Sequence, residues 1–165
     1  MRDVKAADEG VAPRWGRRVG IAVLSIVVLL GAFGLLGVKS RTTDAVASGY
    51  TLHVTYPQIA RAGLDVPWRA EVRHSGGFGK ELTLAISADY FRMFETQGFY
   101  PTPDHVGDDG TFVYMTFDNP VGDEFVLDYD AYIQPAAQLG KTATVKVIVA
   151  HIVVVQAHLE TWLLP

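Results

Sequence analysis

The chain contains no cysteine among its 165 residues. Without cysteine there is no disulfide, no lipid-modified cysteine anchor and no thiol chemistry. A folded domain in this chain therefore depends on its apolar core alone. Such a composition fits an exported bacterial protein.

The short motifs that carry enzymatic chemistry are also missing. The sequence has no GxSxG, no HExxH and no phosphate-binding loop, since Gly76-Gly77-Phe78-Gly79 lacks the lysine and helix that a phosphate needs. Its five histidines are never spaced to place two zinc ligands on one face. We therefore expect no catalytic residue and no cofactor. A hydrolase of the cell envelope that uses paired carboxylates is the remaining enzymatic alternative.

Basic residues are scarce after residue 48. Residues 49–165 hold seven basic and fourteen acidic side chains, a net charge of −7. Nucleic-acid binding requires clustered lysine and arginine to displace the counterions of the phosphate backbone. The charge balance therefore excludes nucleic acid as an expected partner.

One apolar run of twenty residues, Val19 to Val38, contains Ser25 as its only polar side chain. As a helix it would be about 30 Å long, which matches the hydrocarbon core of a bilayer. Three arginines stand just before the run and two basic residues just after it. Because basic residues are enriched on the cytoplasmic side, we predict a cytoplasmic tail at 1–18, a transmembrane helix at 19–38 and an extracytoplasmic remainder.

The rival interpretation of this run is a cleaved signal peptide. Ala45-Val46-Ala47 offers a small-x-small site, with cleavage between Ala47 and Ser48. The run is longer than the usual ~7–15 residues of a signal peptide, and charged residues separate it from the site. We therefore favour an uncleaved anchor in the cell membrane. We expect the polar stretch 39–49 to be a linker.

Glycines recur every third residue at Gly31, Gly34 and Gly37 near the end of the run. Small residues allow transmembrane helices to approach closely, so these three are candidates for packing against a partner helix. The alternative is that glycine is simply frequent in membrane spans.

From Tyr50 onward, apolar and polar residues alternate with a period of two. We predict about seven strands, at 50–56, 66–73, 82–87, 112–117, 125–131, 142–149 and 152–162. A hairpin turn near Ala150-His151 would join the last two. The aromatic residues in Ser87–Thr96 have helical spacing and predict a short crossover helix. The spacing is typical of an all-β, antiparallel sandwich of the immunoglobulin type over residues 50–165.

The stretch Ala62 to Ser87, with turns at Arg61-Ala62-Gly63 and Ser75-Gly76-Gly77, resembles bacterial surface β-sandwich modules of the CARDB-like and conserved-repeat families. The basic tail, single span and β-rich remainder look like uncharacterised single-pass membrane proteins of actinobacteria. The resemblance implies a fold and carries no catalytic residues with it.

Two groups of side chains are candidate sites. The aromatic group is the best candidate for contact with a partner protein, since aromatics are enriched in interfaces, although the same residues would serve to close one end of a sandwich. Its members are Tyr90, Phe91, Phe94, Phe99 and Tyr100. The carboxylate group could bind calcium, although we favour the interpretation of a solvated acidic surface. Its members are Asp104, Asp108, Asp109, Asp128 and Asp130.

These observations favour a non-catalytic interaction module, tethered outside the membrane, that binds or supports another membrane or envelope protein. The alternative function is a sandwich that binds calcium or cell-wall carbohydrate, using the acidic loops with Phe99, Tyr100 or Trp68.

Overall fold

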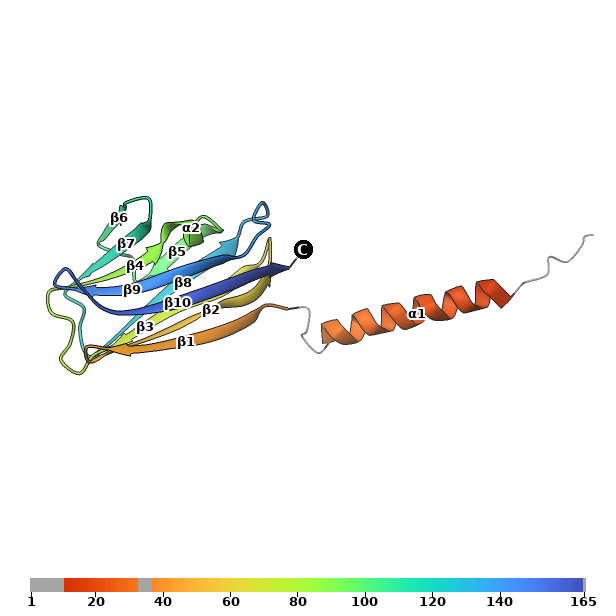
Figure 1. Ribbon diagram of the computed structural model, residues 1–165, viewed down its shortest axis with the longest axis horizontal. Coiled ribbons are helices and arrows are strands. Elements are labelled where there is room, and N and C mark those ends of the chain that lie inside the picture. Colours follow the sequence, from red (N-terminus) through yellow and green to blue (C-terminus); the bar gives the residue numbers. More distant parts are fainter. Residues whose placement is uncertain (1–10, 33–36, 165) are drawn as a thin grey trace, which may run out of the picture. The chain divides into compact units, whose positions relative to one another are not determined.

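The computed structural model describes residues 11–32 and 37–164. They divide into two compact units, with the boundary between Gly37 and Val38 (Figure 1). The first unit contains helix α1 (Val11–Ala32). Its segment Trp15–Ala32 has a mean hydropathy of 1.6, so α1 is long and apolar enough to cross a membrane. None of this segment is buried against the rest of the protein.

The end of the apolar run differs from the prediction. Gly37 lies in a bend, and Val38 is half-buried against the core of the second unit. Gly31 belongs to α1, whereas Gly34 lies outside the described residues. The three glycines therefore do not form one helical face within the described part of the chain, because Gly37 has left the helical conformation.

The second unit is built almost entirely of strands. Ten are described: β1 (Lys39–Ala47), β2 (Tyr50–Arg61), β3 (Asp65–Arg73), β4 (Glu81–Ser87), β5 (Phe94–Tyr100), β6 (His105–Asp108), β7 (Phe112–Asp118), β8 (Glu124–Ile133), β9 (Lys141–Val149) and β10 (Ile152–Leu164). The predicted strands correspond to β2, β3, β4, β7, β8, β9 and β10. β1, β5 and β6 were not predicted as strands.

The strands form a curled, mixed sheet in the order β5-β8-β3-β2-β10-β9-β4-β7-β6, with β1 attached to β2. Nearly all neighbours are antiparallel. The exception joins β2 to β10 in parallel, where Trp162, Leu163 and Leu164 pair with Ile59, Ala60 and Arg61. The prediction of a purely antiparallel arrangement is therefore wrong at this junction, which links the two halves of the sheet.

The predicted linker at 39–49 is a strand and a tight turn. β1 pairs with β2 along its whole length, from Lys39 opposite Ile59 to Ala47 opposite Tyr50. Ser48 and Gly49 have φ angles of 51° and 80°, as a two-residue hairpin turn requires. The residues of β1 are mostly exposed and offer little apolar surface, so the sequence shows no apolar pattern there. Backbone pairing with β2 makes this segment a strand.

The predicted crossover helix is shorter than expected. Helix α2 covers Ala88–Phe91 only, and Phe94 already belongs to β5. The segment does cross from β4 to the opposite edge of the sheet, as predicted. Ser87 makes no capping hydrogen bond with its side chain. Its hydroxyl instead accepts a hydrogen bond from the backbone N–H of Thr144.

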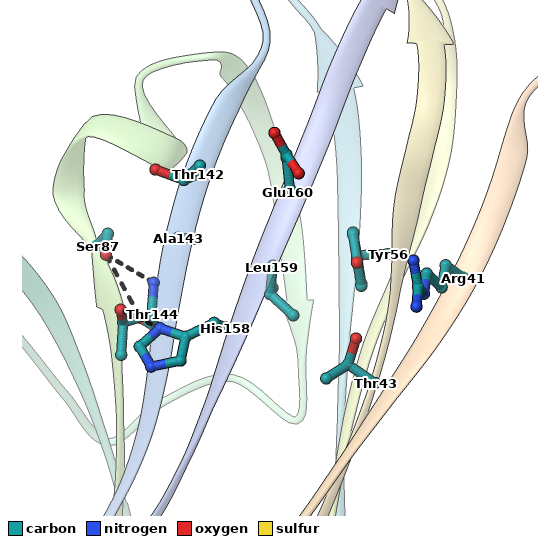
Figure 2. Close-up of a pocket in the computed structure, with 10 residues that line it drawn as sticks. All are labelled: Arg41, Thr43, Tyr56, Ser87, Thr142, Ala143, Thr144, His158, Leu159 and Glu160. Carbon is teal, nitrogen blue, oxygen red and sulfur yellow. Dashed lines mark hydrogen bonds between the residues drawn. The ribbon is translucent and has the colours of Figure 1, made fainter.

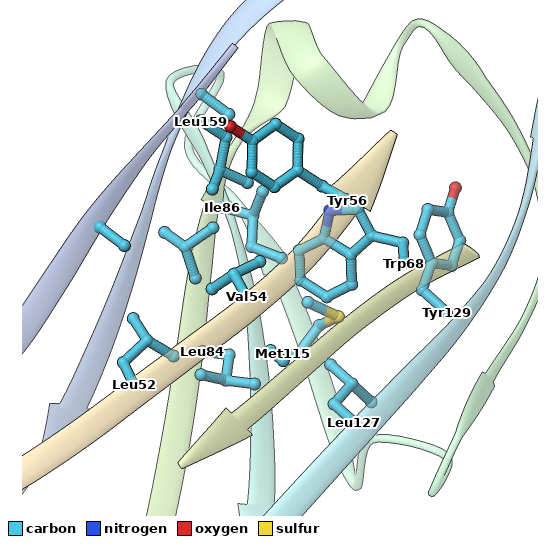
Figure 3. Packing of buried hydrophobic residues seen from close by; sticks show 14 of the residues in the cluster. Leu52, Val54, Tyr56, Trp68, Leu84, Ile86, Met115, Leu127, Tyr129 and Leu159 are labelled. Atoms are coloured by element: carbon cyan, nitrogen blue, oxygen red, sulfur yellow. The ribbon is translucent and has the colours of Figure 1, made fainter. Parts of the chain in front are cut away.

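The core lies between the two halves of the curled sheet (Figure 3). Inward-facing residues alternate with outward-facing ones, as on β10, where every second residue from Val155 to Thr161 is buried. The largest fully buried side chains are Tyr90, Phe78, Leu52, Leu82, Leu84, Ile86, Met115, Leu127, Ile133, Val54, Val72 and Val145. Burial of so many large apolar groups lets the unit fold without a disulfide.

One polar residue is buried among them. The Thr161 hydroxyl donates to the Pro57 carbonyl at 2.6 Å and accepts from the Tyr90 hydroxyl at 2.9 Å. Burial raises the pKa of Tyr90, so its hydroxyl stays protonated and can donate. This chain of hydrogen bonds fastens α2, β10 and β2 together.

Replacing Thr161 with valine keeps the side-chain volume but removes the hydrogen bonds to the Pro57 carbonyl and the Tyr90 hydroxyl. We expect Thr161→Val to lower the free energy of unfolding by about 2–3 kcal/mol, measured by urea denaturation. The control is Thr42→Val, since Thr42 makes its hydrogen bond with Thr55 on the exposed surface. Equal midpoints for the two variants would contradict a structural role for the buried network.

The predicted turn at Ala150-His151 is confirmed as a tight hairpin turn between β9 and β10. Ala150 and His151 have φ angles of 49° and 65°, which residues other than glycine and asparagine adopt at a cost. We expect the double replacement Ala150→Asn, His151→Gly to stabilise the protein by about 1 kcal/mol. Thermal unfolding measures this, and an unchanged or lower melting temperature would show that the turn is not strained.

Candidate functional site

A hollow of the second unit lies between β1 and β10. β1 pairs with β2 only, and β10 pairs with β9 over Ile152–Thr161 and with β2 only at its last three residues. No backbone ladder joins β1 to β10 within residues 37–164. Each strand consequently has one edge outside any backbone ladder along this stretch, and the two edges face each other across the hollow.

The polar part of this hollow has a volume of about 560 Å³. Its lining residues come from β1, β2, the end of β4, β9 and β10, and are Arg41, Thr43, Tyr56, Ser87, Thr142, Ala143, Thr144, His158, Leu159 and Glu160. Figure 2 shows the buried ring of Tyr56 between the side chains of β10 and those of β1. Tyr56 and Leu159 thus provide an apolar floor beneath polar walls.

A second hollow of about 370 Å³ lies farther along the same two strands. It is lined by Ala45, Val46 and Ala47 of β1 and by residues 153–156 of β10. Val46 is 74% exposed and Val153 is 46% exposed. The two hollows together form what we call the β1–β10 cleft, with a polar half near Arg41 and an apolar half near Val46.

Hydrogen bonds in the polar half join neighbouring strands. His158 Nδ1 lies 3.0 Å from Thr144 Oγ1, and Ser87 Oγ lies 2.9 Å from the backbone nitrogen of Thr144. Thr144 therefore stands between the imidazole and the serine hydroxyl (Figure 2). These contacts fasten β4, β9 and β10, and they do not arrange Ser87 as a nucleophile beside a base.

The aromatic candidates separate into buried and exposed members. Tyr90 and Phe94 are buried, and Phe91 and Phe99 are half-buried against the core. Phe91, Phe94 and Phe99 all pack on the ring of Tyr129, with Phe99 stacked at 4.7 Å between centroids. Of the five, only Tyr100 is largely exposed, at 79%. Most of the group therefore contributes to packing around α2 and β5.

The aspartate candidates lie on different strands and turns. Asp109 is held by the backbone N–H groups of Thr111 and Phe112 and by the Tyr114 hydroxyl, and these hydrogen bonds keep the pKa of its carboxyl below the usual value. Asp128 accepts two hydrogen bonds from Arg69.

The remaining three aspartates are also dispersed. Asp104 accepts from the backbone of Asp118, Asp108 from that of Gly110, and Asp130 is an exposed residue of β8. Within the part of the chain that the structure describes, no group of three or more metal-ligating side chains converges. Calcium binding stays a prediction, without a site assembled from these five residues.

The cleft residues were not among the sequence-based candidates, because their proximity depends on long-range pairing and on β1. One local signal did exist. Ser48-Gly49 between two stretches containing threonine and valine is a hairpin dipeptide, and it would have placed β1 beside β2. The position of β10 next to β1 has no such signal.

No protein-family model and no curated protein matches this chain.

Proposed function

We propose that this protein is a non-catalytic interaction module, held at the outer face of the cell membrane by α1, which binds or supports another membrane or envelope protein. The excess of arginine before the apolar run supports a cytoplasmic N-terminus and an extracytoplasmic second unit. The absence of recognisable catalytic motifs from the sequence supports a binding role over an enzymatic one.

We infer that the second unit is an enlarged immunoglobulin-like sandwich. Immunoglobulin domains have one sheet in the order A-B-E-D and another containing C, F and G. β2, β3, β8 and β5 follow the first order, and β4, β9 and β10 match the second set. β1, β6 and β7 are then additions to a seven-strand framework. This correspondence supports the proposed likeness to CARDB-like surface modules.

The observation that carries the proposed function is the pair of open strand edges in the β1–β10 cleft. Exposed edges invite aggregation unless they are covered, and proteins use them to bind extended segments through main-chain hydrogen bonds. We therefore propose that the partner contributes an extended segment to the cleft. Its apolar side chains would fit the half near Val46, and its polar ones the half near Arg41 and Glu160.

Photo-crosslinking in native membranes tests this proposal. A photoreactive amino acid replaces Thr43 or Glu160, which line the cleft from β1 and β10. The matched control carries it at Thr102, an exposed position in the loop before β6. We expect both cleft positions to give the same adduct, and the crosslinked peptides to map to one contiguous segment of one envelope protein.

The control should give no such adduct. Crosslinks from Thr43 and Glu160 to unrelated proteins, or the same adduct from Thr102, would overturn the assignment of the cleft. A discrete adduct from Thr102 alone would indicate that the partner binds elsewhere on the second unit.

A further inference from the structure

Several exposed apolar side chains gather at one end of the second unit. β1 begins at this end and β10 ends there, because Lys39 and Trp162 both pair with Ile59 (Figure 1). Trp162 is 60% exposed and Leu164 is 45% exposed. Leu139, which is 77% exposed, lines the same hollow as Trp162, a space of about 450 Å³. We call Leu139, Lys141, Trp162 and Leu164 the Trp162 surface.

Basic residues accompany the apolar ones at this end. Lys141 is exposed and lies opposite Thr161, next to Trp162 in the strand register. Arg92, which forms an ion pair with Asp89, lines a further hollow with Leu139 and Lys141. Lys39 begins β1 at the same end.

Acidic residues gather at the opposite end of the strands. Glu81 pairs with Asp118, and Arg73 pairs with Glu124, where β4 and β8 begin and where β3 and β7 end. Acidic side chains are also present at the Trp162 end, where Glu160 lines the hollow of Trp162 and Asp89 forms an ion pair with Arg92. An exposed tryptophan beside lysine is the composition that occurs in the headgroup region of membranes.

Few residues of the sequence separate the apolar run from this end of the domain. The apolar run continues without a charged residue to Val38, and Val38 packs on the core of the second unit. Lys39 is the next residue, and it starts β1 at the end that carries Trp162. No long spacer therefore separates the apolar run from this end of the domain.

We infer that the Trp162 surface rests in the headgroup layer of the membrane in which α1 is anchored, an inference that depends on the proposed membrane anchoring. Trp162, Leu139 and Leu164 enter the interface, where an indole ring is favoured. Lys141 and Lys39 contact the lipid phosphates. The domain is thereby held at the membrane by its own surface as well as by the chain.

Tryptophan fluorescence of the full chain in lipid nanodiscs tests this inference. Trp15→Phe removes the tryptophan of α1, and Trp68 is buried in the core, so Trp162 is the reporter that solvent or lipid can reach. We expect blue-shifted emission that lipids with brominated acyl chains quench. The additional change Trp162→Phe should abolish that quenching. The matched control places tryptophan at Val121, which is 93% exposed in the loop between β7 and β8, in the variant lacking Trp15 and Trp162.

The control tryptophan should be quenched by acrylamide in water and not by brominated lipid. If Trp162 behaves like the control, the inference is overturned. Alkaline washing of vesicles containing the same protein distinguishes the two proposals. Loss of the chain from washed vesicles contradicts anchoring by α1, whereas retention with a water-exposed Trp162 contradicts only the lipid contact.

Discussion

A chain that begins at Ser48 will unfold at a much lower urea concentration than one that begins at Val38. The longer chain retains β1, which has nine residues in register with β2. Side-chain contacts reinforce the pairing, since His53 Nδ1 lies 2.5 Å from the Asp44 carboxylate and Thr42 bonds to Thr55. Each hydrogen bond of a ladder contributes about 1 kcal/mol net, so we expect a loss of about 4 kcal/mol or more.

Urea denaturation followed by circular dichroism measures the difference, with the chain from Val38 as the control. Similar midpoints would mean that β1 adds nothing to the fold. The result also bears on processing, because cleavage between Ala47 and Ser48 would remove all of β1, including Ala45, which packs against the core. A large loss would therefore favour the uncleaved anchor over the signal peptide.

Gly140→Ala will be strongly destabilising. A Cβ atom at this position would lie 1.9 Å from the Thr161 carbonyl oxygen and 2.9 Å from the Trp162 Cα. Both contacts are with backbone, so relief requires β10 to move away from the loop before β9. That movement would also disturb the buried hydrogen bonds of Thr161. Overpacking against side chains costs about 1–3 kcal/mol, and we expect about 3 kcal/mol or more against backbone.

The matched control is Gly107→Ala on the exposed strand β6, where a Cβ would meet nothing within 4 Å. We expect that change to alter the free energy of unfolding by less than about 0.5 kcal/mol. Chemical denaturation of both variants tests the prediction. Comparable stability of the two would show that the loop at Gly140 yields without strain.

The sequence pattern predicted the strands whose two faces differ. In β2, β3 and β8 a buried residue alternates with a more exposed one for most of the strand, so a period of two was visible. The first predicted strand ends at Tyr56, just before Pro57, yet β2 continues to Arg61. Proline is tolerated there because it sits opposite Ser40, next to the register shift of β1.

The remaining strands lacked that signal. β6 is exposed on both faces, and in β1 only Thr43 and Ala45 are half-buried, so neither strand has a clear apolar face. The first residues of β5, 94–96, were predicted as the end of a helix because Tyr90, Phe91 and Phe94 have helical spacing. The chain instead leaves the helix after Phe91, and Phe94 pairs with Ile133 of β8. Tertiary contact with the Tyr129 ring overrides the local pattern.

The candidate site was less predictable than the fold. The aromatic residues were identified as a group, and they do pack together, but most of them face the core. The β1–β10 cleft joins Arg41, Tyr56 and Glu160, which are far apart in the sequence. The β1–β2 hairpin places Arg41 opposite Tyr56, but only the parallel pairing of β2 with the last strand brings Glu160 beside them, and a parallel pairing leaves no local mark in the sequence.

The most direct test of the account is the mass and location of the mature protein in its native host. Mass spectrometry of alkaline-washed membranes should find the chain with α1 still attached to β1. A soluble fragment that begins at Ser48, with none of the longer chain in the membrane fraction, would contradict an anchored module.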